Sequence, residues 1–165
     1  MSNYYFDDVR TLANHLKYKD PNYTPIRLHS TLIMLFVYYY YNTDVEGKPK
    51  YLFNGSVLAK NTGVNVKEIV EEFDKHRYSK SYGYEPKEYS FTDSELDTKV
   101  NDLINHTTKE IEQNFSDFEL FVFVNDMALY LDNPEDYFNT DKPIPYDLLL
   151  DSIYRYLEDG DEEEE

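Results

Sequence analysis

Histidine side chains are the first candidates for chemistry in this chain, because an imidazole can act as a general base or as a metal ligand. The four histidines, His15, His29, His76 and His106, are far apart in the sequence. Asp102 lies four residues before His106 on the same predicted helix, so this pair could ligate a metal ion. An exposed ion pair explains the same spacing, and it is the interpretation we favour.

The familiar catalytic motifs are absent from the sequence. The chain has no Cys, no P-loop, no Gly-x-Ser-x-Gly and no His-Glu-x-x-His, and the acidic run at 132–136 lacks the central glycine of an EF-hand. With 33 acidic residues, neighbouring carboxylates arise by chance and mark no acid–base pair. We therefore expect no enzymatic activity, no cofactor and no metal. A metal-dependent enzyme built on carboxylates and His106 is the weakest of the alternatives.

Charge is divided unequally between the two halves of the chain. Residues 1–84 carry 9 acidic and 11 basic side chains, whereas residues 85–165 carry 24 acidic and 5 basic ones. A strongly negative half opposes direct binding to nucleic acid or to an anionic membrane, and it favours binding to a basic protein surface. Acidic residues that serve only solubility are the alternative, but solubility needs far less charge.

Ten acidic side chains near the C-terminal end are the candidates for electrostatic contact with a partner. They come from two predicted helices and the turn between them, where they could imitate the spaced phosphates of a nucleic-acid duplex. These residues are Asp117, Glu119, Asp126, Asp132, Glu135, Asp136, Asp141, Asp147, Asp151 and Glu158.

Four consecutive tyrosines, Tyr38, Tyr39, Tyr40 and Tyr41, are the candidates for aromatic contact. On a helix their side chains point in all directions, so some must reach a surface or a pocket. They either belong to a core helix whose hydroxyls reach its rim, or they form a contact surface for a partner.

The elements that position these residues are mainly helices. Apolar spacing predicts a helix from Phe6 to Leu16 and a buried central helix from Ile26 to Tyr41, which Thr24 and Pro25 begin. Ser/Thr/Asn residues followed by Glu three positions later predict capping boxes at Asn65, Thr92 and Ser116. These open helices through Phe73, through Ile111 and through Leu131, and the last helix is predicted from Tyr146 to Leu157.

Non-helical structure is expected in three places. Asn54-Gly55, between the apolar runs 51–53 and 56–58, predicts a small β-hairpin, and Thr62-Gly63 predicts another turn. Residues 78–91 are rich in Tyr and predict a loop. The fold class is thus mainly α, with about six helices and a small hairpin.

One domain is expected over residues 1–157, followed by an acidic tail at 158–165 that self-repulsion keeps disordered. The N-terminus does not look like a signal peptide, and the most apolar run, 32–41, is about half the length of a membrane span. We expect a soluble protein of the bacterial cytoplasm, with an oligomeric state that the sequence does not indicate.

Several segments together resemble the Panacea domain family. They lie at 12–15, 24–32, 51–59, 63–73, 116–120 and 143–145, and the resemblance covers most of residues 6–157. It implies a mostly α fold and a non-enzymatic role, like that of antitoxins that bind a toxin directly, adaptors for proteolysis and phage-associated proteins. No functional residue is transferred from the family to this chain.

These observations lead to two main hypotheses of function. In the first, a protein encoded by a phage or mobile element uses its acidic half to occupy the basic groove of a nucleic-acid-binding protein. The target would be a CRISPR effector, a restriction enzyme or a toxin, and the protein would inhibit it. In the second, an antitoxin or proteolysis adaptor binds a toxin through an apolar groove.

Overall fold

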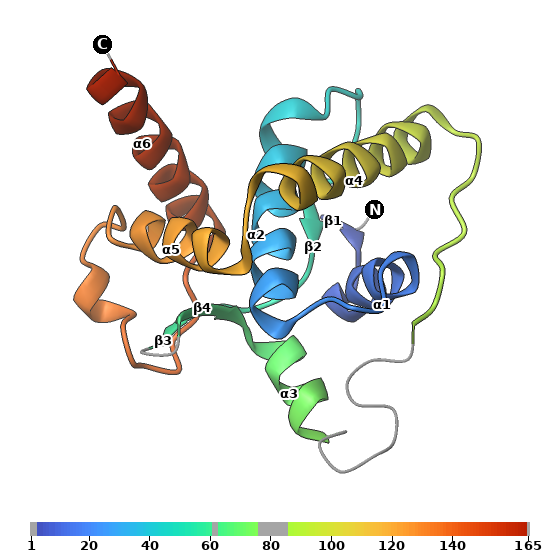
Figure 1. Ribbon diagram of the computed structural model, residues 1–165. Coiled ribbons are helices and arrows are strands. Elements are labelled where there is room, and N and C mark those ends of the chain that lie inside the picture. Colours follow the sequence, from blue (N-terminus) through green and yellow to red (C-terminus); the bar gives the residue numbers. More distant parts are fainter. Residues whose placement is uncertain (1–2, 61–62, 76–85, 165) are drawn as a thin grey trace.

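The computed structural model describes residues 3–60, 63–75 and 86–164, and this part of the chain is mainly helical (Figure 1). It contains six α-helices, which confirms the predicted fold class. Their bounds are α1 (Val9–Lys19), α2 (Pro25–Asn42), α3 (Lys67–Lys75), α4 (Glu95–Asn114), α5 (Asp117–Ala128) and α6 (Tyr146–Glu164). None of the helices in this part of the chain combines the length and the apolar character needed to span a membrane.

Helix α2 is the centre of the fold, as its apolar composition predicted. Eleven of its 18 residues are buried, and they cover nearly its whole circumference from Leu28 to Tyr39. Helices α1, α4 and α5 and two short strands pack around it. The Thr24 hydroxyl accepts a hydrogen bond from the Arg27 N–H at 3.2 Å, and Pro25 occupies the first turn, so the predicted start of the helix is confirmed.

The strands form two separate pairs. Strand β1 (Tyr4–Phe6) pairs in parallel with β2 (Tyr51–Phe53), and β3 (Val57–Lys60) pairs antiparallel with β4 (Gly63–Val66). The small hairpin therefore exists, but it lies at 57–66 and not around Asn54-Gly55.

The predicted hairpin turn at Asn54-Gly55 is wrong because both residues bond to distant elements. The Tyr146 hydroxyl accepts from the Gly55 N–H at 2.9 Å and donates to the Gly55 carbonyl at 2.6 Å. The Asn54 N–H donates to the Phe6 carbonyl, and the Asn54 carbonyl accepts from the Val9 N–H. Asn54 and Gly55 thus link the start of α1 to the start of α6.

Two helix starts are also corrected. Phe6 belongs to β1, and α1 begins at Val9 after the cap Asp8. Val66 belongs to β4, and no capping box forms between Asn65 and Glu68, because the Glu68 carboxylate accepts from the Ser56 N–H at 2.9 and 3.0 Å.

Among helices α4 to α6, only α5 has the cap that the sequence predicted. The Ser116–Glu119 capping box of α5 is present as predicted, although α5 ends at Ala128 and not at Leu131. Helix α4 is capped by Ser94 rather than Thr92, whose backbone and hydroxyl both bond to Asp97. Helix α6 continues to Glu164, past its predicted end at Leu157. The predicted disorder of residues 158–165 stays a prediction.

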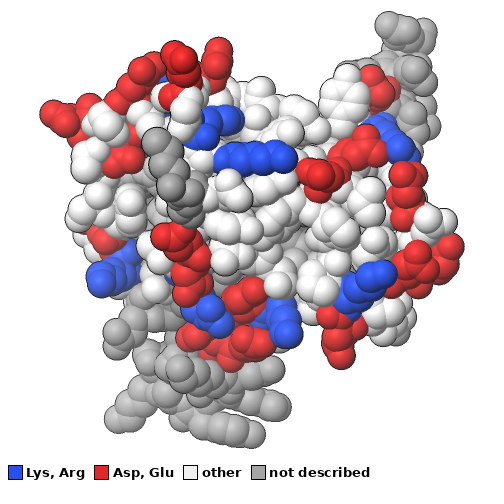
Figure 2. All heavy atoms as spheres, turned by 180° about the vertical axis from the view of Figure 1, so that it is seen from behind, with Lys and Arg blue, Asp and Glu red and all other residues white. Residues whose placement is uncertain are grey.

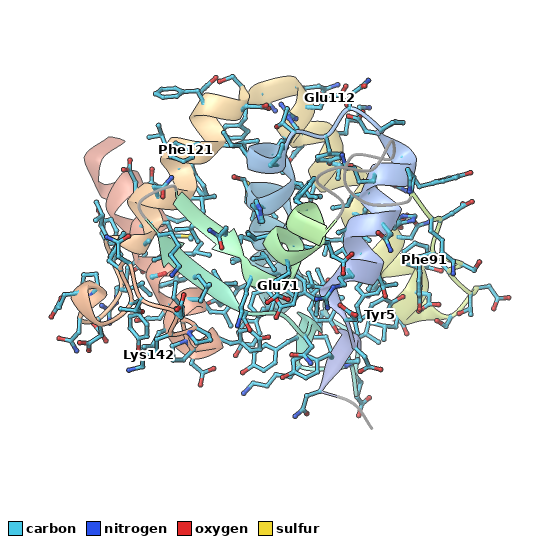
Figure 3. The ribbon with its side chains drawn as sticks, turned by 90° about the horizontal axis from the view of Figure 1, so that it is seen from below. Tyr5, Glu71, Phe91, Glu112, Phe121 and Lys142 are labelled. Carbon is cyan, nitrogen blue, oxygen red and sulfur yellow. The ribbon has the colours of Figure 1, made fainter. Side chains whose placement is uncertain are left out.

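An aromatic cluster holds residues 86–91 against β1 and α1. Tyr89 contacts Tyr5 and Phe6, and Phe91 packs edge-on against His15 at 5.4 Å between ring centroids. Tyr5 and Phe91 lie on the same side of the molecule in Figure 3. The Tyr89 N–H donates to His15 Nδ1 at 3.0 Å. Residues 86–91 are non-helical as predicted, whereas 78–85 and Thr62 of the predicted Thr62-Gly63 turn lie outside the described residues.

Two glycines have positive φ angles, and only one of them is also crowded. Gly63 has φ +119°, and a Cβ at this position would lie 2.8 Å from the Phe121 ring. Gly47 has φ +77°, and a Cβ there would have no neighbouring atom within 4 Å. We expect Gly63→Ala to lower the free energy of unfolding by ~3 kcal/mol and Gly47→Ala by ~1 kcal/mol. Urea unfolding of both variants checks this, and equal losses would show that the Phe121 contact is unimportant.

Two buried histidines make stability depend on pH. His15 and His29 each accept a backbone N–H through Nδ1, and burial lowers the pKa of both, that of His29 to about 4. Because the unfolded chain takes up protons near the ordinary histidine pKa and the folded chain does not, stability is complete above about pH 6.5 and is lost as pH falls toward 4. For His29 the loss is on the order of 3 kcal/mol.

Urea unfolding at about pH 7 and about pH 4.5 measures this loss. His29→Gln keeps an acceptor for the Val66 N–H but does not titrate, so we expect it to weaken the pH dependence. His106→Gln, at an exposed position, is the matched control. A His29→Gln variant with the same pH dependence as the parent would contradict the assignment.

Candidate functional site

An open groove lies where the end of α2 meets α6, and it combines two sets of candidate residues. Its volume is about 380 Å³, and it is lined by Tyr40, Tyr41, Asp147, Leu150, Asp151 and Tyr154. We call it the tyrosine–aspartate groove. Asp147, Asp151 and Tyr154 are spaced i, i+4 and i+7 on α6, so they share one face of that helix.

The four consecutive tyrosines separate in the structure. Tyr39 is fully buried and donates its hydroxyl to the Pro49 carbonyl at 2.6 Å. Tyr38 is half-buried and lines a different, apolar hollow. Tyr40 is half-buried and Tyr41 is 47% exposed, and both face the groove. The proposed aromatic surface is thus available from Tyr40 and Tyr41, while Tyr39 is a core residue.

Contacts between neighbouring rings preorganise the aromatic wall of the groove for ligand binding. Ring centroids lie 6.1 Å apart for Tyr154–Tyr41, 5.0 Å for Tyr41–Tyr40 and 6.2 Å for Tyr40–Tyr51. The Tyr41 hydroxyl donates to the Leu150 carbonyl at 3.3 Å, which fixes the end of α2 against α6. Because these rings already pack on one another, a ligand would not have to order them.

The two carboxylates of the groove keep free acceptor capacity. Asp147 is exposed and accepts the Tyr51 hydroxyl at 3.2 Å. Asp151 is half-buried and pairs with Arg155 at 2.8 Å. A carboxylate offers about four lone-pair directions, so each can accept a further donor. Aromatic faces beside carboxylates are the surroundings that favour a guanidinium or an ammonium group.

Most of the other candidate carboxylates have partners within the fold. Asp117 accepts from the Thr24 hydroxyl at 2.6 Å and from Arg27 Nε at 2.9 Å. The Thr24 hydrogen bond, followed by that of Arg27, holds the pKa of Asp117 below its usual range. Glu119 completes the capping box of α5. Asp117 therefore joins α5 to α2 and Glu119 caps its own helix, so both are less available to a partner than the sequence implied.

Asp132 and Asp141 are likewise paired, although closer to solvent. Asp132 accepts from Arg155 at 2.9 Å, and Asp141 accepts from Lys60 at 2.7 Å. The Lys60 hydrogen bond and charge lower the pKa of Asp141. Exposed pairs of this kind contribute little to stability, and a basic partner could compete for them.

The remaining candidates lie on the surface. Asp126 on α5 and Glu158 on α6 are exposed, as are Glu135 and Asp136 in the short 3-10 helix η1 (Pro134–Asp136). Glu158 accepts the Tyr154 hydroxyl, which raises the pKa of that tyrosine. Figure 2 shows acidic side chains along the edge below the C-terminal end of α6, with Lys and Arg side chains between them. The acidic half therefore presents a mixed surface.

No metal site is formed by the described residues, among which no three His, Cys, Asp or Glu side chains are placed to hold an ion. The exposed pair predicted for Asp102 and His106 forms with a different carboxylate, since His106 Nε2 lies 3.2 Å from Glu110 Oε1. His76 lies outside the described residues.

Sequence reasoning missed Tyr154 and Leu150 as groove residues. The signal was present for Tyr154, which follows Asp147 by seven positions and Asp151 by three on the predicted last helix. The alignment of that face with the end of α2 depends on tertiary packing, which no local pattern contains.

Comparisons of this chain with protein-family models, with curated proteins and with solved structures give no match. The resemblance to the Panacea family therefore stays a prediction, and the chemistry of the site has to carry the functional argument.

The division between paired and open carboxylates can be tested through stability. We expect Asp117→Asn to lower the free energy of unfolding by ~1 kcal/mol, because it weakens the contact with Arg27 and removes a negative charge from the start of α5. Asp126→Asn, on the exposed side of the same helix, should change it by less than ~0.5 kcal/mol. Equal effects in urea unfolding would contradict the structural role of Asp117.

Proposed function

We propose that this protein is a non-catalytic inhibitor that binds a basic, nucleic-acid-binding protein and occupies its nucleic-acid groove. The observation that carries the proposal is the tyrosine–aspartate groove. It places aromatic rings beside two carboxylates of the acidic half that can each accept a further hydrogen bond. The target class is a CRISPR effector, a restriction enzyme or a toxin that acts on nucleic acid. The protein would act in the bacterial cytoplasm and be encoded by a phage or mobile element.

Long-range attraction supports the proposal. The net charge of the chain is −17, and the excess of acidic residues lies in residues 85–165. A field of this size accelerates encounters with a positively charged surface and disfavours acidic partners. The pairing of Asp117, Asp132 and Asp141 leaves the net charge unchanged, so the steering remains even though these carboxylates have partners.

Short-range contact comes from the groove. An arginine side chain of the partner can stack its guanidinium on Tyr41 or Tyr154 and donate to Asp147 and Asp151. A lysine can supply the charge but lacks the planar face. Proteins that bind nucleic acid present such side chains at the spacing of phosphates, and carboxylates on a rigid helix can meet several of them.

A second candidate function, an antitoxin or proteolysis adaptor that binds through apolar contacts, is favoured by a different surface. Phe118, Val122 and Leu129 follow one face of α5 and its C-terminal end, with exposures of 72%, 37% and 63%. An apolar hollow between α2, α5 and α6 also contains Met34, Tyr38 and Leu157 in its lining. Exposed apolar stripes of this kind are typical of protein contacts.

The two functions differ in their response to salt and to substitution. In a pull-down from a bacterial lysate, we expect a basic nucleic-acid-binding protein to be captured at ~0.05 M salt and lost at ~0.5 M salt. Asp147→Asn/Asp151→Asn should reduce capture about tenfold or more, which corresponds to a loss of ~1.4 kcal/mol. Glu110→Gln/Glu112→Gln removes the same charge from exposed positions on α4 and should have a small effect. Capture that resists salt and is lost in Phe118→Ser would instead support the antitoxin or adaptor.

A direct titration tests the groove without any partner. We expect arginine amide to shift the ring resonances of Tyr40, Tyr41 and Tyr154 in NMR spectra, and the uncharged analogue citrulline amide to leave them unchanged. Equal shifts with both compounds would show that the groove does not select a cation.

A further inference from the structure

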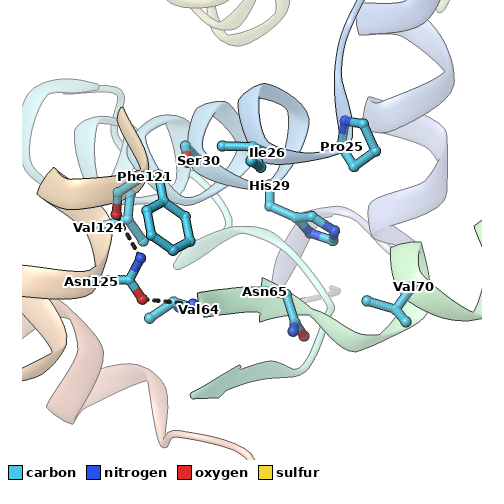
Figure 4. Close-up of a pocket in the computed structure, with 10 residues that line it drawn as sticks. All are labelled: Pro25, Ile26, His29, Ser30, Val64, Asn65, Val70, Phe121, Val124 and Asn125. Atoms are coloured by element: carbon cyan, nitrogen blue, oxygen red, sulfur yellow. Dashed lines mark hydrogen bonds between the residues drawn. The ribbon is translucent and has the colours of Figure 1, made fainter. Parts of the chain in front are cut away.

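A second hollow lies at the opposite end of α2, away from the tyrosine–aspartate groove. Its volume is about 190 Å³, it is open to solvent on one side, and it is lined by the start of α2, strand β4, helix α3 and helix α5 (Figure 4). Most of its wall is apolar, and its lining consists of Pro25, Ile26, His29, Ser30, Val64, Asn65, Val70, Phe121, Val124 and Asn125.

The wall contains an imidazole N–H that has no hydrogen-bond partner among the described residues and remains accessible from the hollow. His29 is only 9% exposed, and its Nδ1 accepts the Val66 N–H at 3.0 Å. Burial lowers the pKa of His29 to about 4, so the ring is neutral at pH 7 and carries its single proton on Nε2. Nε2 has no hydrogen-bond partner among the described residues, in a side chain that lines the cavity. Nε2 is not one of the fully buried side-chain atoms that lack a partner, which are Asn14 Oδ1, His15 Nε2 and Thr31 Oγ1, so an acceptor that enters the hollow can reach it.

The surrounding wall is fixed in place. The Asn125 side chain accepts the Val64 N–H at 3.2 Å and donates to the Phe121 carbonyl at 2.6 Å, as the dashed lines in Figure 4 show. The Phe121 ring lies so close to Gly63 that a Cβ there would approach it to 2.8 Å. Since α5 and β4 are held by these contacts, the cavity exists before any ligand arrives.

Size and charge restrict what the cavity can take. A cavity of about 150 Å³ is large enough for benzene, so this one accommodates a single ring with a small substituent. It is smaller than the sites that bind drug-sized molecules or nucleotides, which begin near about 300 Å³. The net charge of −17 opposes the entry of an anion, and the donor is uncharged.

We propose that this cavity binds a small neutral molecule with one ring and a carbonyl group, whose oxygen accepts a hydrogen bond from His29 Nε2–H. The ring packs between Val64, Val70 and Phe121. Asn65, which is half-buried at the side of the cavity, can accept a donor on the same substituent. This binding is independent of the electrostatic partner and of the groove at the other end of α2.

Titration of the full chain with three probes tests the proposal by NMR. Benzamide should give saturable shifts of the backbone signals of Val64, Val66 and Val70, with Kd on the order of 1 mM. Toluene has the ring without the acceptor, and we expect it to bind about fivefold more weakly. Benzoate, the charged analogue of the same shape, should bind about tenfold more weakly than benzamide. Equal binding of all three probes, or no saturable shift with benzamide, would overturn the proposal.

A cavity-filling variant locates the binding site. Val70 is half-buried, so Val70→Phe can place its larger side chain in the cavity without removing core volume, and it should abolish benzamide binding. Val122→Phe, the same substitution on the exposed face of α5, should leave binding intact. If Val70→Phe retained benzamide binding, the cavity would not be the site. If no probe bound but Val70→Phe abolished capture of the protein partner, the cavity would be a contact for a protein side chain, and the proposal would be wrong.

Discussion

The complete burial of the middle of α2 is the constraint on which the rest of the structure depends. A helix that is apolar nearly all round must be covered on every side, because each exposed large side chain forgoes roughly 1.5–3 kcal/mol of burial. One half of the chain does not supply enough cover. Helix α1 and strand β2 come from the N-terminal half, whereas α4 and α5 come from the acidic half. The two halves, so different in charge, therefore share one hydrophobic core.

That shared core decides where the negative charge can go. Helix α5 must bring its buried face to α2, and its start is then held beside the start of α2 by the contacts of Asp117 with Thr24 and Arg27. Carboxylates near this junction and near the hairpin form ion pairs with basic residues of the N-terminal half, such as the pair between Asp141 and Lys60. On the outer face of α6, Asp147 has Lys50 nearby, and Asp151 pairs with Arg155, the only described basic residue of that helix. These two carboxylates line the groove and can accept further donors.

The predictable part of this structure is the part that local sequence controls. Helix positions follow from apolar periodicity, and the caps at Thr24 and Ser116 were correct because a cap involves only neighbouring residues. The hairpin was misplaced because Asn54-Gly55, a strong local turn signal, bonds instead to Phe6, Val9 and Tyr146. The parallel pairing of β1 with β2 joins segments more than 40 residues apart, and no local pattern contains it. The tyrosine–aspartate groove was unpredictable for the same reason. The tyrosines of α2 and the aspartates of α6 could be identified on their own helices, but no local pattern shows that the two helices come together.

The location of both candidate sites follows from the same burial. Because the middle of α2 is enclosed, the helix reaches solvent only near its ends, and each end carries side chains with polar groups and large apolar surfaces. At the start, Ile26 and His29 meet β4 and α5 around a small neutral cavity. At the end, Tyr40 and Tyr41 meet the acidic face of α6 around an open groove. One helix thus carries at one end the cavity that we propose for an uncharged ring and at the other end the groove that we propose for a cation. The two candidate sites are separated by the middle of α2, which is buried and tightly packed, so we expect a change at one of them to leave the other intact.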